Sequence, residues 1–202
     1  MAEQYLVSKK YHEISLLAGE TARQVSKNGE EWAKYLTTAA RLYRYPFDDQ
    51  MLIYAQRPDA SACATMETWN EKMFCWVNRG AKPISLFDRE SERPSLKYVI
   101  DDSDVHKSRS LGKDPYLWEI REEHKDAVLA QLEKTYGATD KDNSFESRLM
   151  EIAGRIAEDY YGELMQDMSY AKEGSFLEEF DDLNVGLRLR ETLSASIAYT
   201  LL

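Results

Sequence analysis

The chain has 202 residues and a formal net charge of −10. This length suits one large domain or two small ones, and 43% hydrophobic residues exclude full-length disorder and collagen-like repeats. A basic-then-apolar leader and an apolar run of about 18 residues are both lacking, so we expect a cytosolic protein with no membrane partner. The two cysteines, Cys63 and Cys75, are expected as free thiols in a reducing cytosol.

The excess of negative over positive charge lies entirely in the second half of the chain. Residues 1–100 hold 14 Lys and Arg against 13 Asp and Glu, whereas residues 101–202 hold 12 against 23. Within the second half, residues 142–182 contain 12 acidic residues and three basic ones. Such a segment repels a phosphate backbone and attracts a basic groove.

Apolar residues at steps of three and four predict two helices near the N-terminus. The first stripe consists of Tyr11, Ile14, Ala18, Ala22 and Val25, and the second of Trp32, Leu36, Ala39 and Tyr43. Pro46 ends the second helix, and Asp48 is in position to cap a short third helix that ends before Pro58.

The period changes after Gly80, where residues 83–87 and 96–100 form two runs typical of β-strands. Residues 101–115 are polar and predict a loop, and helices are expected again from about residue 117 to the end. We therefore predict an α+β fold with N-terminal helices, a small, mostly antiparallel sheet around residues 76–101 and a C-terminal helical cover. The predicted domains are residues 1–105, with the helices and the sheet, and residues 106–202, an acidic helical region packed on them.

Signatures of catalysis are scarce. The sequence has neither a phosphate-binding glycine loop nor a nucleophile elbow, and its three histidines fall in separate elements. We therefore expect no enzyme activity, no catalytic residue, no metal and no cofactor. One acidic cluster consists of Asp101, Asp102, Asp104 and His106; it lacks calcium-loop spacing, and a solvated loop accounts for it better than a metal site.

Rings and cations alternate between Trp69 and Tyr98, as in platforms for single-stranded nucleic acid, where rings stack on bases and cations meet phosphates. The alternative is that most of these rings face the core of a small sheet. The candidate nucleic-acid-binding residues are Trp76, Arg79, Lys82, Arg93 and Lys97.

Two stretches of the chain resemble a known family. Residues 45–60, which read YPFDDQMLIYAQRPDA, and residues 76–82, which read WVNRGAK, resemble the N-terminal region of large methylase/helicase proteins of conjugative elements. They are more distantly similar to the single-stranded-DNA-binding domain of ArdC-type antirestriction proteins. The resemblance covers most of residues 40–202 and implies a bacterial host cell; the His-Glu-x-x-His motif of the ArdC metalloprotease-like domain is absent here.

Stand-alone proteins of such elements resemble counter-defence factors, including type II-A anti-CRISPR inhibitors of Cas9. The resemblance and the acidic second half together suggest a non-enzymatic inhibitor that binds the basic nucleic-acid channel of Cas9, or another nucleic-acid-handling defence enzyme, and blocks DNA binding or cleavage. The candidate partner-binding residues are Glu151, Glu158, Asp159, Glu163, Asp167, Glu178, Glu179, Asp181 and Asp182. The alternatives are an antirestriction module that coats single-stranded DNA and an interaction domain of a larger protein.

Overall fold

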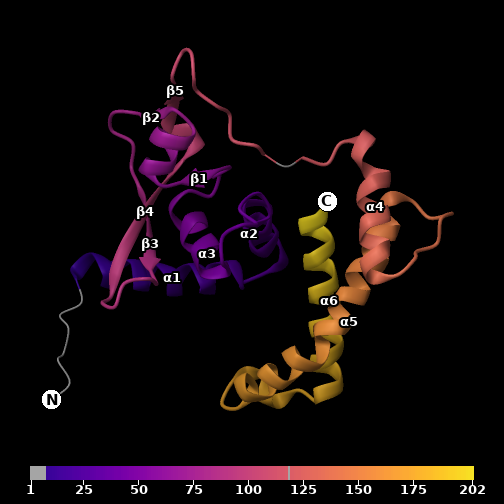
Figure 1. The fold of residues 1–202 in the computed structure, drawn as a ribbon. Helices are drawn as coiled ribbons and strands as arrows, with labels where there is room; N and C mark the ends of the chain where they lie inside the picture. The colour runs from indigo at the N-terminus through magenta and orange to yellow at the C-terminus, as the bar shows by residue number, and fades with distance from the viewer. Residues whose placement is uncertain (1–7, 118) are drawn as a thin grey trace. The chain divides into compact units, whose positions relative to one another are not determined.

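The computed structural model describes residues 8–117 and 119–202 (Figure 1). The chain forms two compact units, Met1–Trp118 and Glu119–Leu202. The first combines helices with short antiparallel strands, and the second is helical, so the predicted α+β fold is confirmed. The units divide later than the predicted boundary at residue 105, because residues 105–107 pair with a strand of the first unit.

Three helices open the first unit: α1 (Lys9–Val25), α2 (Gly29–Arg41) and α3 (Phe47–Gln56). The first two begin at capping side chains, since Ser8 accepts a hydrogen bond from the backbone of Tyr11, and Asn28 accepts one from that of Glu31. Helix α3 differs from the prediction. Its N-cap is Pro46, which makes no side-chain bond, and Asp48 lies inside the first turn, where its charge suits the helix dipole.

The strands form two separate antiparallel sheets. In the first, the order is β1 (Cys63–Ala64), β4 (Ser95–Asp101) and β3 (Ile84–Asp88), with Ile84 opposite Val99. The second sheet is a ribbon of β2 (Cys75–Val77) and β5 (Val105–Lys107). The short helix η1 (Thr68–Lys72) precedes β2 along the chain, and the short helix η2 (Asp102–Asp104) precedes β5. The segment predicted as a loop therefore contains a strand, β5. With only three residues, this strand is too short to show an alternation of apolar and polar side chains.

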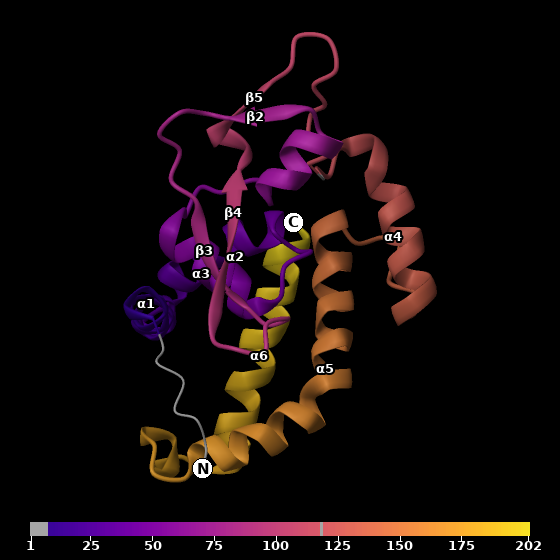
Figure 2. The ribbon, with the colours of Figure 1, turned by 60° about the vertical axis from the view of Figure 1, so that its left-hand side comes forward.

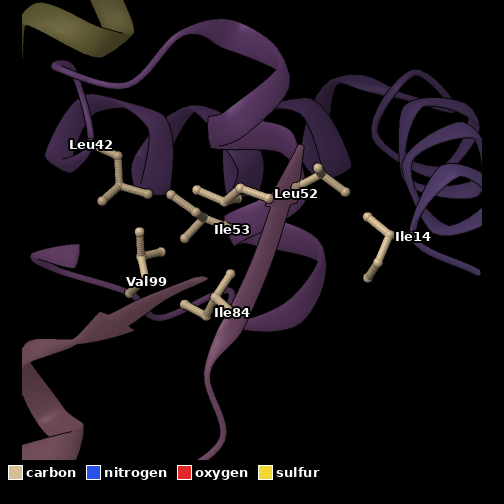
Figure 3. Packing of buried hydrophobic residues seen from close by; sticks show 8 residues of the cluster. Ile14, Leu42, Leu52, Ile53, Ile84 and Val99 are labelled. Atoms are coloured by element: carbon tan, nitrogen blue, oxygen red, sulfur yellow. The ribbon is translucent and has the colours of Figure 1, made fainter. Parts of the chain in front are cut away.

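The core of the first unit lies between its helices and the β3–β4 hairpin (Figure 3). Leu52 and Ile53 on α3 are fully buried, and they pack with Ile14 of α1 and with Ile84 and Val99 of the sheet. Ile14 belongs to the first predicted apolar stripe, and Ile84 and Val99 belong to the two predicted β-type runs. Packing on both faces of α3 fixes the hairpin against the helices, and most of the stability of this unit comes from such burial.

The second unit consists of α4 (Glu122–Tyr136), α5 (Phe145–Lys172), the short helix η3 (Phe176–Glu179) and α6 (Asp182–Leu201). Helices α5 and α6 form a long hairpin (Figure 2). Leu129 of α4 and Leu149 and Ile152 of α5 form the core of the second unit, and Leu201 of α6 packs against them. Helix α6 begins at Asp182, because Asp181 caps it through the backbone of Asn184.

Candidate functional site

The β2–β5 ribbon carries an exposed aromatic pair. Trp76 on β2 lies opposite His106 on β5, and 49% of the Trp76 surface is exposed. The His106 ring is exposed as well, and its Nδ1 lies 2.8 Å from Oδ1 of Asn78. A tryptophan and an imidazole that share one open face offer two flat surfaces on which a base can stack.

The opposite face of the ribbon holds it to the rest of the unit. Cys75 is buried against Trp69 and Ile100, and Val77 and Val105 pack beside them. The indole Nε1 of Trp69 donates a hydrogen bond of 2.8 Å to the Ile100 carbonyl, at the end of β4. Because side chains alternate along a strand, this anchoring directs Trp76 outward.

The loop after β5 folds back on the start of β2. The Ser108 amide donates to the Phe74 carbonyl and the Lys113 amide to the Met73 carbonyl, at 3.0 and 2.9 Å. The Lys113 ammonium lies 5.5 Å from the centre of the Phe74 ring. Phe74 has a φ of 54°, a left-handed conformation that is uncommon outside glycine. This turn adds a third ring and a further cation to the ribbon.

The ribbon and its flanking segments are strongly basic. Residues 72–82 and 105–113 contain six lysines and arginines and no carboxylate: Lys72, Arg79, Lys82, Lys107, Arg109 and Lys113. Lys107 pairs with the exposed Asp114. Within residues 8–117 the other five make no ion pair, so their charges remain available to an anionic ligand.

The five predicted nucleic-acid-binding residues divide into two groups. Trp76, Arg79 and Lys82 belong to the ribbon and its following turn, whereas Arg93 and Lys97 belong to the β3–β4 hairpin. In both views, the turn between β3 and β4 lies at one end of β4, and the β2–β5 ribbon lies near the other end (Figures 1 and 2). Lys97 is also engaged, since its Nζ lies 3.0 Å from Oδ2 of Asp49.

Sequence reasoning missed the half of the basic face that β5 contributes. His106, Arg109 and Lys113 lie in the predicted loop, about 30 residues from Trp76 along the chain, and β5 pairing brings their segment beside it. The available signal was the absence of acidic residues between Val105 and Lys113.

Part of the predicted acidic set forms a row on α5. Asp159, Glu163 and Asp167 are exposed and four residues apart, so they share one face of the helix. Within residues 119–202 none of the three carboxylates makes an ion pair or a side-chain hydrogen bond. The two other predicted acids of α5 are paired, Glu151 with Arg155 and Glu158 with Arg190.

The remaining predicted acids lie in the turn between α5 and α6. Asp182 pairs with Lys172 at 2.7 Å, and Glu178 accepts a hydrogen bond of 3.1 Å from the Gly174 amide. Asp181 accepts from the backbone and side chain of Asn184, and these bonds lower its pKa. Glu179 lies beside them at the end of η3 and is exposed. These carboxylates therefore stabilise the conformation of the turn and also give it a negative charge.

The acidic cluster after β4 serves the fold. Burial raises the pKa of Asp101, but hydrogen bonds from the Ser103 hydroxyl and from the amides of Ser61, Ser103 and Ala62 outweigh it and lower the pKa overall. Asp104 pairs with Arg57. Among residues 8–117 and 119–202, no group of three His, Cys, Asp or Glu side chains could hold a metal ion.

The two cysteines are free thiols in this structure. Cys75 is buried, and Cys63 is partly buried. Burial, followed by the neighbouring Asp101 carboxylate, raises the pKa of the Cys63 thiol to about 12. A thiol of that kind is protonated at neutral pH and is a poor nucleophile.

Comparisons with known proteins found no match to a family model, a curated protein or a solved structure. In the part of the chain that the structure describes, no helix is long and apolar enough to cross a membrane.

Proposed function

We propose that the protein binds single-stranded DNA through the β2–β5 ribbon and acts by binding, without catalysis. One observation carries the proposal: two segments far apart in the sequence pair into a ribbon that exposes Trp76 and His106, and its flanks hold five cations that make no ion pair within residues 8–117. Bases would stack on these two rings, and phosphates would lie against the cations. The net charge of −10 confines binding to this local patch.

The resemblance to conjugative-element proteins suggests the setting for this activity. Conjugation delivers a single DNA strand into a bacterial cell, and a protein that coats the strand in the cytoplasm would hide it from restriction. The proposed role is therefore that of an antirestriction module.

The experiment is a titration of a fluorescent oligothymidylate with the full chain, followed by anisotropy. Trp76→Ala should weaken binding by about 1–3 kcal/mol, the usual contribution of one base stacked on an aromatic ring. Three phosphate contacts would give a salt slope of about −2 on logarithmic axes, and Arg79→Ala should lower its magnitude.

Two variants serve as controls. Tyr43→Ala removes another exposed ring of the same unit, since the Tyr43 side chain is 60% exposed. Arg93→Ala removes a cation of the β3–β4 hairpin. Both should leave the affinity unchanged. Equal affinity of Trp76→Ala and the wild-type chain would refute the proposal, and a loss in Arg93→Ala equal to that in Arg79→Ala would mean that binding is not localised to the ribbon.

A second candidate function is the inhibition of Cas9, or of another defence enzyme with a basic nucleic-acid channel. The observation that favours it is the row of Asp159, Glu163 and Asp167, three exposed carboxylates without partners in residues 119–202. A row of charges at helical spacing can occupy a groove that binds phosphates. Of the predicted partner-binding acids, this candidate function uses the three unpaired ones of this row.

Cleavage of target DNA by guide-loaded Cas9 tests this candidate. The triple variant Asp159→Asn, Glu163→Gln, Asp167→Asn should lose inhibition. The matched variant Glu20→Gln, Glu67→Gln, Glu92→Gln removes the same charge from exposed positions of the first unit and should keep it. Full cleavage in the presence of the wild-type chain would exclude the candidate.

A further inference from the structure

The turn between α5 and α6 exposes a group of large apolar side chains. Phe176 is 77% exposed, Phe180 51%, Leu183 73% and Leu187 47%. We call these four residues the hairpin tip. They occupy one end of the α5–α6 hairpin (Figure 2). Scattered apolar residues are normal on protein surfaces, but a local group of this kind marks a contact site.

The tip is an ordered structure. Gly174 takes a φ of 69°, which turns the chain after α5, and Ser175 caps η3 through the backbone of Leu177. Asp181 then caps α6. The Phe176 and Phe180 rings meet edge to face at 6.3 Å, and Leu183 and Leu187 lie one turn apart on α6. The capping hydrogen bonds therefore fix the backbone that carries these rings, and binding a partner would cost little additional conformational entropy.

The surroundings of the tip are acidic. Residues 173–187 contain five carboxylates and no lysine or arginine: Glu173, Glu178, Glu179, Asp181 and Asp182. Arg188, directly after this range, is exposed and pairs with Glu191. Lys172 neutralises one of them through its pair with Asp182. An apolar centre with a negative rim fits a partner whose apolar face has a positive rim.

We infer that the hairpin tip binds a basic amphipathic helix of a partner protein. Its leucine-like side chains would pack on Phe176, Phe180 and Leu183, and its lysines or arginines would meet the carboxylates. Nucleic acid and anionic membranes carry the same sign of charge as the rim and are repelled. A second tip would set one acidic rim against another. The inference deepens the second candidate function, a cationic protein partner, by naming the apolar anchor, and it is independent of DNA binding by the ribbon.

The test uses a defined probe. A helical peptide of about 18 leucines and lysines, with the leucines on one face, is titrated against the full chain by isothermal calorimetry. The expected dissociation constant is about 10 μM. The double variant Phe176→Ser, Leu183→Ser should weaken binding about tenfold, as the loss of anchor residues does at other interfaces. All substitutions are at exposed positions, and circular dichroism verifies that the variants fold.

Two controls make the result specific. The variant Leu16→Ser, at a residue of α1 that is 55% exposed, should bind the peptide as the wild-type chain does. A peptide of the same composition with its leucines spread around the helix should bind at least about tenfold more weakly. Equal binding of the two peptides would reduce the interaction to charge attraction and overturn the inference.

Two other results would also overturn it. One is the absence of peptide binding. The other is sedimentation equilibrium showing a dimer that the double variant abolishes, since the tip would then bind a second copy of the chain. Peptide binding and Cas9 inhibition are measured separately, and the triple variant of the α5 row leaves the tip intact, so either proposal can fail alone.

Discussion

Lys97 on β4 contacts a carboxylate that solvent does not reach. Its Nζ lies 3.0 Å from Oδ2 of Asp49 on α3, and the Asp49 side chain is 1% exposed. The other oxygen, Oδ1, has no hydrogen-bond partner among the described residues. The ion pair links the β3–β4 hairpin to the helices, and Lys97 is the main compensation for the buried charge.

Removing the lysine should therefore destabilise the first unit. For Lys97→Met we expect a loss of about 2–4 kcal/mol, somewhat below the usual 3–5 for a broken buried pair, because Lys97 is 42% exposed and water can partly replace it. Urea unfolding measures this. The double variant Lys97→Met, Asp49→Asn should recover part of the loss, and no recovery would show that the charge of Asp49 is not what makes Lys97 important.

Glu133 should make the stability of the second unit depend on pH. Hydrogen bonds from Arg148, at 2.7 Å, and from Thr139 lower its pKa from the ordinary 4.5 to about 2. The unfolded chain therefore takes up a proton at higher pH than the folded one, so this stabilisation is complete above about pH 5 and is lost as the pH falls toward 2. The urea midpoint of Glu133→Gln should fall less steeply over this range than that of the wild-type chain, and parallel curves would contradict the prediction.

Two glycines of the second unit should respond oppositely to the same substitution. Gly137 ends α4 with a φ of 95° and a ψ of 154°, and an added Cβ would lie 3.0 Å from an Arg155 nitrogen. Gly137→Ala should cost about 1–3 kcal/mol. Gly162 lies within α5 with open space around it, so Gly162→Ala should stabilise by about 0.5–1 kcal/mol. Thermal denaturation of the two variants gives the signs directly.

The Cys63 thiol should react slowly in the folded protein. With a pKa of about 12, about one molecule in ten thousand carries the thiolate at pH 8. In the variant Cys75→Ser, alkylation by iodoacetamide should accelerate about tenfold per pH unit from 8 to 10. A rate at pH 8 equal to that in urea would show that burial does not protect the thiol.

The elements in which an apolar pattern extends over several residues could be predicted from the sequence. The stripe containing Ile14 and Val25 gave α1, and the two β-type runs gave β3 and β4, because many residues contribute to each pattern. Strand β5 has three residues and no period that can be recognised. Its existence depends on pairing with β2 across about 30 residues, and tertiary pairing of this kind is not a local property of the sequence.

The candidate site was predicted in part for the same reason. Composition identified Trp76, Arg79 and Lys82, which lie within one short segment. It also selected Lys97, whose ion pair with Asp49 depends on how α3 packs on the sheet. Nearness in the sequence was a poor guide in this second case, since the hairpin turns Arg93 and Lys97 away from the ribbon.

The division of the ribbon into two faces separates recognition from folding. Cys75, Val77 and Val105 hold it in place from one side, and the opposite side carries Trp76 and His106, which contribute nothing to that core. Substitutions on the open side can therefore accumulate without loss of the native state. Such a surface is free to evolve new ligand preferences while its scaffold is retained.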